Sequence, residues 1–193
     1  MNNKVDAVFE KIDKINAEDP NKEIVDGSEV PKEWIYGRRM TEMLTTYKEN
    51  PSVELQIAAR GQHIKRWHIP RSEYPMDRKG YLKWRTMLKI YHGELLSSLM
   101  EEEGFGSDSI AKVVELVNKK KLKTDQESKE LEDVVCLVFL KFYFHDFAAQ
   151  HPDEKVIDIV QKTWGKMTEK GHDLALKLNY DVGDLALIQK ALS

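Results

Sequence analysis

Three polar side chains fall on helical faces that are otherwise apolar. At 100° per residue, His92 shares a face with four leucines between 88 and 99, and Asp133 shares one with Cys136 and two leucines. His63 lies among apolar residues of another segment, with an arginine on either side. A buried carboxylate must be paired or bound to a metal, because leaving it uncompensated is costly. Two neutral imidazoles and a carboxylate suit a divalent ion such as zinc, manganese, iron or magnesium.

We therefore predict that His63, His92 and Asp133 are metal ligands. The same residues allow a second interpretation, in which Asp133 caps a helix or pairs with a histidine or an arginine as an internal support. The dipeptide His145-Asp146 is interpreted as a chance occurrence.

A basic segment is the second feature with chemical content. Residues 60–89 hold nine Lys/Arg and two acids, a local net charge of +7, although the whole chain has a net charge of -3. Such a segment indicates a localised anionic partner. Guanidinium groups match phosphate or carboxylate oxygens, and aromatic residues alternate with the arginines here, as in nucleotide or single-stranded RNA sites. The predicted anion-binding residues are Arg39, Arg60, Arg66, Arg71, Arg78 and Arg85.

Nearly every segment that must position these residues has helical periodicity, because apolar residues recur at intervals of three and four. We expect an all-α helical bundle forming a single domain over residues 1–193, with no strands. A loop is expected up to about residue 30. The first expected helix ends near 17–20. The others run from 31 to about 50, from 53 to about 68, from 81 to 103, from 107 or 108 onward, from about 126 to 150, from 152 onward, and over 172–178 and 182–192. The helix at 126–150 is apolar on nearly every side and is the predicted centre of the bundle.

Composition restricts the class of protein. The 193 residues are 41% hydrophobic and 33% charged, which fits a folded globular chain. The longest apolar run, 134–140, is too short for a membrane span, and the first residues have no signal-peptide core, so we expect a cytoplasmic protein without a membrane partner. The one cysteine, Cys136, is expected to be an inert core residue.

The pattern of inward histidines followed by the aspartate of ELEDVVCLVFL resembles the HD-domain superfamily of all-helical, metal-dependent phosphohydrolases. The stretch LQIAARGQHIKRW resembles the helix of that superfamily that ends in a His-Asp pair, with His63 in the place of the histidine. Two positions depart from the pattern, since Ile64 follows His63 and Arg38-Arg39 stand where the first histidine is expected. The resemblance implies the HD-domain fold and a metal-activated water.

Nearly the whole chain also resembles the uncharacterised domain-of-unknown-function family 4202. The matching segments include IDKINAEDPN, YGRRM, AARGQHIKRWHIPRSEYPMDRKGYLKWR, LKTDQE, LEDVVCLVFL and KTWGKM. Members of this family have been labelled glutamyl-tRNA synthetase, and HIPRS and KMTEK superficially resemble the ATP-binding signatures of those enzymes. We reject that interpretation, because those signatures require a Rossmann core of parallel strands.

These observations support three hypotheses. The first is an HD-like, metal-dependent hydrolase of a small phosphorylated compound, with a nucleotide as the leading example. The second is a catalytically degenerate HD-like module that binds an anionic ligand, namely a nucleotide, a carboxylate metabolite or RNA, through the arginine cluster. The third is a protein-interaction scaffold. The only feature in its favour is the acidic character of the chain outside the basic segment. Substrate, metal identity and homo-oligomer formation are left open by the sequence.

Overall fold

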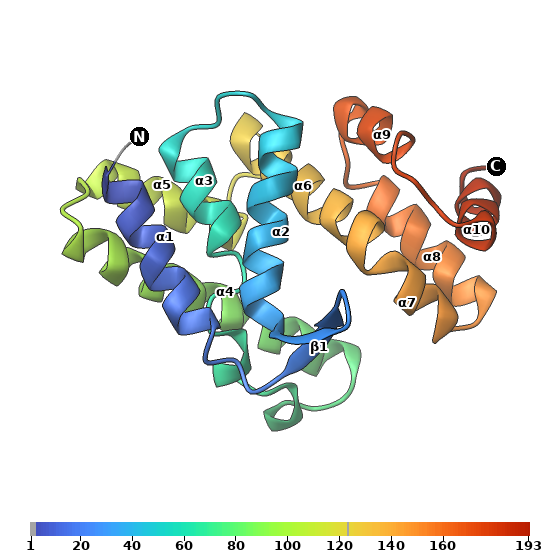
Figure 1. Cartoon of the computed structure of the whole chain (residues 1–193), viewed down its shortest axis with the longest axis horizontal. Helices are drawn as coiled ribbons and strands as arrows, with labels where there is room; N and C mark the ends of the chain where they lie inside the picture. The colour runs from blue at the N-terminus through green and yellow to red at the C-terminus, as the bar shows by residue number, and fades with distance from the viewer. Residues whose placement is uncertain (1–2, 123) are drawn as a thin grey trace. The chain divides into compact units, whose positions relative to one another are not determined.

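The computed structural model describes residues 3–122 and 124–193. Within these ranges there are ten α-helices, two short 3-10 helices and one β-hairpin, which confirms the all-α fold class (Figure 1). The chain divides into two compact units, here called the N-terminal unit (1–121) and the C-terminal unit (122–193). The expected single domain over 1–193 stays a prediction.

The described part of the N-terminal unit, residues 3–121, contains five α-helices. They are α1 (Asn3–Asn16), α2 (Lys32–Tyr47), α3 (Val53–Arg60), α4 (Arg78–Glu102) and α5 (Ser107–Asn118), with the 3-10 helices η1 (Arg66–His68) and η2 (Arg71–Glu73) between α3 and α4. Helix α3 is the centre of this unit, because it packs against α1, α2 and α5, and α4 packs along α5. Four residues of α3 have no exposed surface, namely Leu55, Ile57, Ala58 and Ala59.

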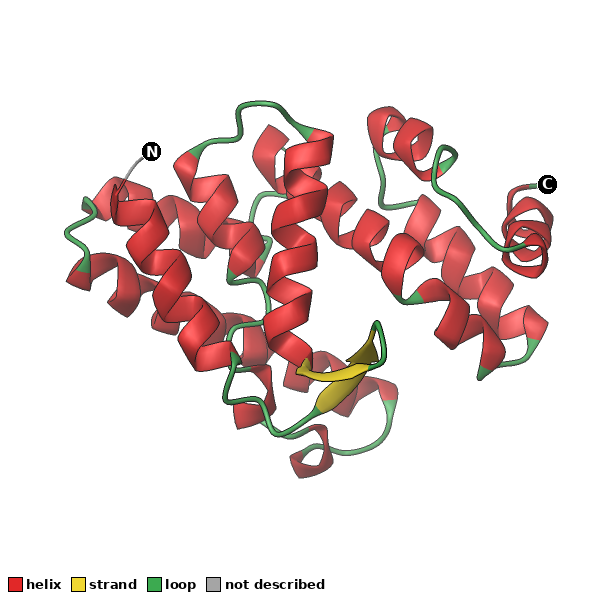
Figure 2. Ribbon diagram, viewed as in Figure 1, coloured by secondary structure: helices red, strands yellow, loops and turns green. Residues whose placement is uncertain are grey.

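A β-hairpin precedes α2, where the sequence predicted a loop without strands. Strands β1 (Lys22–Val25) and β2 (Ser28–Pro31) pair antiparallel, and Figure 2 shows them in yellow. The turn residues Asp26 and Gly27 both have positive φ, +50° and +77°, as a type I′ turn requires. The prediction was wrong because two four-residue strands are too short to produce a clear alternation of apolar and polar residues. The Asp-Gly pair was the available signal.

The predicted helix over 53–68 ends early, at Arg60. Gly61 caps it, and Lys65 has a left-handed backbone with φ of +49°. The side-chain oxygen of Asn16 accepts a hydrogen bond from the Lys65 backbone nitrogen at 2.9 Å and holds this bend. His63 consequently lies in a turn and Arg66 at the start of η1, both outside the α-helix that the sequence predicted for them.

Helix α4 begins where the preceding loop folds back over its first turn. The Asp77 side chain accepts a hydrogen bond from the Gly80 nitrogen at 2.7 Å and caps the helix. The Pro75 carbonyl lies so close to Gly80 that a Cβ there would meet it at 2.0 Å, so this position requires glycine. The tight packing fixes the loop that carries Arg71.

Among its described residues, the C-terminal unit also contains five α-helices. They are α6 (Gln126–Phe142), α7 (Phe144–Ala149), α8 (Asp153–Trp164), α9 (Glu169–Ala175) and α10 (Val182–Leu192). Helix α6 packs against α7 and α9, and α8 packs against α10. Cys136 on α6 is buried at 4% exposure, as expected.

The single helix predicted over 126–150 is two helices in the structure. The chain leaves the helical conformation at Tyr143, with φ of -127° and ψ of -14°. The break directs Phe144 into the core, where its ring lies edge-on to those of Phe139 and Tyr180 at 6.1 and 6.4 Å. Aromatic packing within the unit thus outweighs the continuous apolar pattern of the sequence.

Candidate functional site

A cavity of about 670 Å³ opens in the N-terminal unit, within the usual size range of small-molecule sites. It lies between the loop after α1, the start of α2 and the segment that joins α3 to α4. Four cationic side chains, one carboxyl and two indole rings line it. They are Lys22, Lys32, Arg66, Arg71, Glu33, Trp67 and Trp84.

Glu33 is the acidic residue that lines this cavity, and residues at and just after the end of α1 position it. The Glu33 backbone nitrogen donates a hydrogen bond to the Asp19 carboxylate at 3.0 Å, and its carbonyl accepts one from Asn16 at 3.3 Å. Glu33 is only 7% exposed, and burial raises its carboxyl pKa to about 7, against the opposing effect of Arg66 and Lys32. A carboxyl that titrates near neutrality can both give and take a proton.

His63 lies between Glu33 and Arg66. Its Nδ1 is 3.2 Å from Glu33 Oε2, and its Nε2 is 2.9 Å from Arg66 Nη1. Because arginine can only donate, Nε2 must accept, and Nδ1 therefore carries the hydrogen and donates to Glu33. Tyr36 stacks on the imidazole at 4.0 Å between ring centroids. Burial, together with the charge of Arg66, lowers the His63 pKa well below its usual value, so this imidazole is neutral.

His92 lies beside His63, with 6.3 Å between ring centroids. Its side chain is buried at 2% exposure, as its helical face predicted, and burial followed by the effects of His63 and Arg66 lowers its pKa to about 2. One ring nitrogen bonds to the Gln62 backbone, whereas the buried Nε2 has no hydrogen-bond partner among the described residues.

Asp133, the third predicted metal ligand, lies in the C-terminal unit. Its carboxylate accepts hydrogen bonds from the backbone nitrogen of Thr168 at 2.8 Å and from the Thr168 hydroxyl at 2.5 Å, and it is fully buried. Through these contacts with Thr168, Asp133 holds the start of α9 against α6. The structure brings His63 and His92 together, and metal ligation by the three residues stays a prediction.

The six predicted anion-binding arginines have different surroundings. Arg66 and Arg71 line the cavity. Arg71 donates to the backbone carbonyls of Tyr74 and Pro75 at 2.9 and 2.7 Å, so its charge is fixed in place without a carboxylate in these contacts. The guanidinium groups of Arg66 and Arg71 lie 4.8 and 5.9 Å from the Trp84 ring, which orders them further.

Two other arginines are bound to acidic residues. Arg60 forms two hydrogen bonds to the Asp13 carboxylate, at 2.8 and 2.5 Å, and its side chain is 8% exposed. Arg39 pairs with Glu23 of β1 at 2.5 Å. These two side chains connect elements of the N-terminal unit.

The remaining two arginines are on α4. Arg78 is the first residue of the helix and is exposed. Arg85 donates to the Tyr81 hydroxyl at 3.2 Å and lines a second, smaller hollow with His63 and His92.

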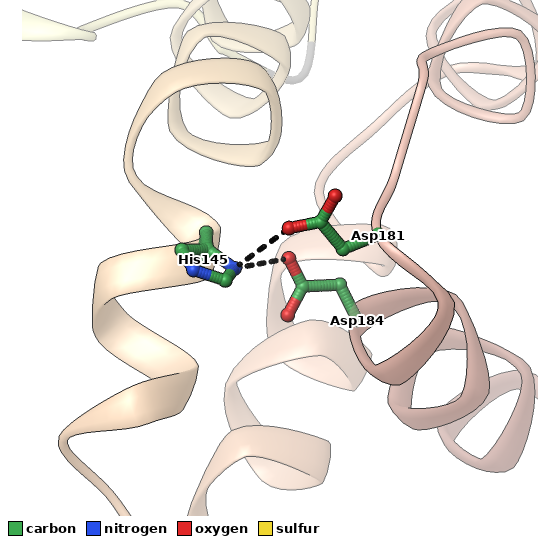
Figure 3. Close-up of side chains that lie close together, drawn as sticks. All are labelled: His145, Asp181 and Asp184. Carbon is green, nitrogen blue, oxygen red and sulfur yellow. Dashed lines mark hydrogen bonds and ion pairs between the residues drawn. The ribbon is translucent and has the colours of Figure 1, made fainter.

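A group of other residues that can hold a metal ion lies in the C-terminal unit. His145 Nδ1 is 3.0 Å from Asp184 and 3.4 Å from Asp181, and the three ligand atoms lie within 4.8 Å of one another (Figure 3). His145 comes from α7, and both aspartates come from the start of α10. The hydrogen bond to Asp184 raises the pKa of the His145 imidazole.

A family model described as "Domain of unknown function (DUF4202)" matches residues 6–188. The chain belongs to the DUF4202 family. Searches of curated proteins and of solved structures each found no match to this DUF4202 chain. None of its described helices combines the length and the apolar character needed to cross a bilayer.

Sequence reasoning missed several residues of the DUF4202 cavity, Glu33 above all. Glu33 stands 30 residues before its partner His63, and an acidic residue in the first turn of a helix is common without any ligand. Lys22 was missed because it belongs to the hairpin, for which a loop was expected, and Lys32 because a single lysine at the start of a helix gives no signal. For His145, the spacing of Asp181 and Asp184 at the start of a helix was the available signal.

Proposed function

We propose that the cavity of the N-terminal unit binds a small phosphorylated compound, of which a nucleotide is the leading example. The observation that carries this proposal is the composition of the wall, in which four cations face one carboxyl group with a pKa of about 7. Around neutral pH the wall therefore has a net charge between +3 and +4. Charge-assisted hydrogen bonds from guanidinium groups to phosphate oxygens are strong and directional.

The indole rings support a nucleotide in particular. Trp67 and Trp84 line the same cavity as the cations, so an apolar ring of the ligand can lie against an aromatic side chain while its phosphate meets Arg66 or Arg71. Arg71 is already held by backbone carbonyls, so binding costs it little side-chain entropy.

The contacts of His63 favour binding over metal chemistry. Both ring nitrogens are engaged, one by Glu33 and the other by a guanidinium group. A metal at Nε2 would have to displace Arg66 and would meet its positive charge.

Hydrolysis of the bound compound is the second candidate, and one observation favours it. Glu33 lines the cavity with a pKa of about 7, which suits a group that takes a proton from an attacking water. In the metal-dependent form, zinc, manganese, iron or magnesium held by His63, His92 and Asp133 would supply a water of lowered pKa. Metal near unit stoichiometry that is lost in a His63→Ala/Asp133→Ala variant would support that form.

The binding proposal is tested by titrating adenosine monophosphate and ribose 5-phosphate into the full-length protein while following tryptophan fluorescence. We expect binding in the micromolar to low millimolar range and at least a tenfold loss in Arg71→Gln. Arg78→Gln removes the same charge from an exposed position on the same segment and should bind normally. Equal losses in both variants, or no saturation with either compound, would contradict the proposal.

Single-stranded RNA is tested in the same titration. If RNA binds tightly at physiological salt, more tightly than the monophosphates, and the affinity falls steeply with added salt, then RNA is the ligand and the small phosphorylated compound is not.

A further inference from the structure

A second hollow in the N-terminal unit adjoins the cavity through the side chain of Arg66, which lines both. Its other polar lining residues are Gln62, His63, Arg85, Lys89 and His92. The space for water-sized atoms in it is about 10 Å³, which is about the room needed for one oxygen atom.

Two hydrogen-bond acceptors lining this hollow are buried and have no partner in the part of the chain that the structure describes. They are His92 Nε2 and Gln62 Oε1, in side chains that are 2% and 5% exposed. The other nitrogen of His92 donates to the Gln62 backbone carbonyl, so Nε2 of this neutral imidazole presents a lone pair. Native proteins rarely leave buried polar atoms unpaired, and an atom that fills this space must therefore donate a hydrogen bond.

The charge around the hollow restricts what the donor can be. Three cations, Arg66, Arg85 and Lys89, line it, and the lining contains no carboxylate among the described residues. A metal ion or an ammonium group would satisfy the acceptors, but these three charges repel it. An anion that carries its own hydrogen can donate to His92 Nε2 and is attracted by the three cations.

We propose that this hollow receives the protonated oxygen of a phosphate group, in inorganic phosphate or in the monoanion of a phosphate monoester. The P–OH group donates to His92 Nε2, and the remaining oxygens accept hydrogen bonds from Arg66 and Arg85. The space of about 10 Å³ is about the room that this one oxygen needs. The other oxygens lie among the partly exposed side chains of Arg85 and Lys89. This inference rests on the proposed function and specifies the phosphate form that the site selects.

Sulfate is the discriminating probe, because it has the shape and the charge of hydrogen phosphate but carries no hydrogen at neutral pH. Sulfate would direct a lone pair at His92 Nε2, where phosphate directs a donor. At pH 7 and constant ionic strength, calorimetric titration of the full-length protein should show phosphate binding at least ten times more tightly than sulfate. A factor of ten corresponds to about 1.4 kcal/mol, near the worth of one hydrogen bond to a charged group.

Variants separate the hydrogen bond from the charge. His92→Met removes the acceptor and should bring the phosphate-to-sulfate ratio close to one, whereas His92→Gln keeps an acceptor and should retain part of the preference. Arg85→Gln should weaken both anions and leave the ratio unchanged. Melting temperatures of all variants establish that they are folded.

The wild-type ratio alone decides the proposal if His92→Met does not fold. Equal binding of phosphate and sulfate, or an unchanged ratio in folded His92→Met, would overturn it. If both anions bind equally and Arg71→Gln weakens them, the proposed function stands and only this inference fails. If neither anion nor a monophosphate binds, both fail.

Discussion

At the scale of single residues, Glu33 links the site to stability. Its carboxyl is buried beside His63 and has a pKa of about 7, compared with 4.5 for an exposed glutamate. Below pH 4.5 the group is protonated in both the folded and the unfolded protein. As the pH rises to about 7, only the folded protein keeps the proton, so stability from this group is lost over that interval.

Glu33→Gln removes this dependence and keeps the side-chain shape. Relative to the wild type, we expect the free energy of unfolding of the variant to rise by about 3 kcal/mol between pH 4.5 and pH 8, because each pKa unit corresponds to about 1.4 kcal/mol. Urea unfolding followed by tryptophan fluorescence at several pH values measures the difference. A constant difference across this range would mean that Glu33 titrates normally.

Arg60 and Arg71 come from the same basic segment but have different roles. Arg60 is bound by Asp13 inside the unit, so Arg60→Met removes the buried partner of that carboxylate and should lower the free energy of unfolding by roughly 2–4 kcal/mol. Anion binding of the folded variant should be unchanged.

Arg38→Gln is the matched control for Arg60→Met. Arg38 is an exposed partner of the same Asp13, at 3.5 Å, and exposed pairs contribute little. If Arg60→Met were as stable as Arg38→Gln, or lost anion binding while folded, the structural role assigned to Arg60 would be wrong.

At the scale of elements, one prediction concerns the contact between α6 and α9. The buried Asp133 carboxylate accepts two hydrogen bonds from Thr168, which is the N-cap residue of α9. Asp133→Asn weakens this contact and should lower the free energy of unfolding by about 1–3 kcal/mol. Phosphate binding should persist, because the cavity belongs to the N-terminal unit.

Chemical unfolding and phosphate titration of Asp133→Asn together test this assignment. If the variant has normal stability but no longer binds phosphate, Asp133 takes part in ligand binding, and its assigned role as a support is wrong.

The elements differ in how far the sequence determines them. Long helices with a clear apolar face and a capping residue, such as α4 after Asp77, are predictable because local signals and packing agree. The hairpin at 22–31 and the bend after Arg60 were missed. The bend depends on a hydrogen bond from Lys65 to Asn16, which is 49 residues away, and no local pattern reveals such a contact.

The same reasoning applies to the candidate site. The sequence identified Arg66, Arg71 and the inward His92, because charge runs and helical faces are local properties. It could not separate Arg60 and Arg39 from the cavity arginines, since their acidic partners lie at Asp13 and Glu23. It also missed Glu33, whose environment arises only when the start of α2 meets the segment after α3.

At the scale of the whole molecule, the features with chemical content are divided between the two units. The N-terminal unit holds the cationic cavity, and the C-terminal unit holds the group His145, Asp181 and Asp184. Nitrogen and carboxylate ligands of this kind suit zinc.

If the protein takes up zinc, we expect it at His145 and not at His63. Zinc titration of protein stripped with a chelator should then show binding that His145→Ala abolishes and His63→Ala leaves unchanged. Metal content measured by elemental analysis after dialysis gives the stoichiometry. Loss of zinc in His63→Ala would instead favour the metal-dependent hydrolase.

The central claim is that the cavity of the N-terminal unit binds a phosphate compound through its arginines without a metal. Calorimetric titration of adenosine monophosphate into chelator-treated full-length protein, beside the Arg71→Gln variant, tests it most directly. The account predicts saturable binding near one ligand per chain, unchanged by removal of metals and weakened at least tenfold in the variant. Binding that appears only after a divalent metal is restored, or that is equal in the two proteins, would contradict it.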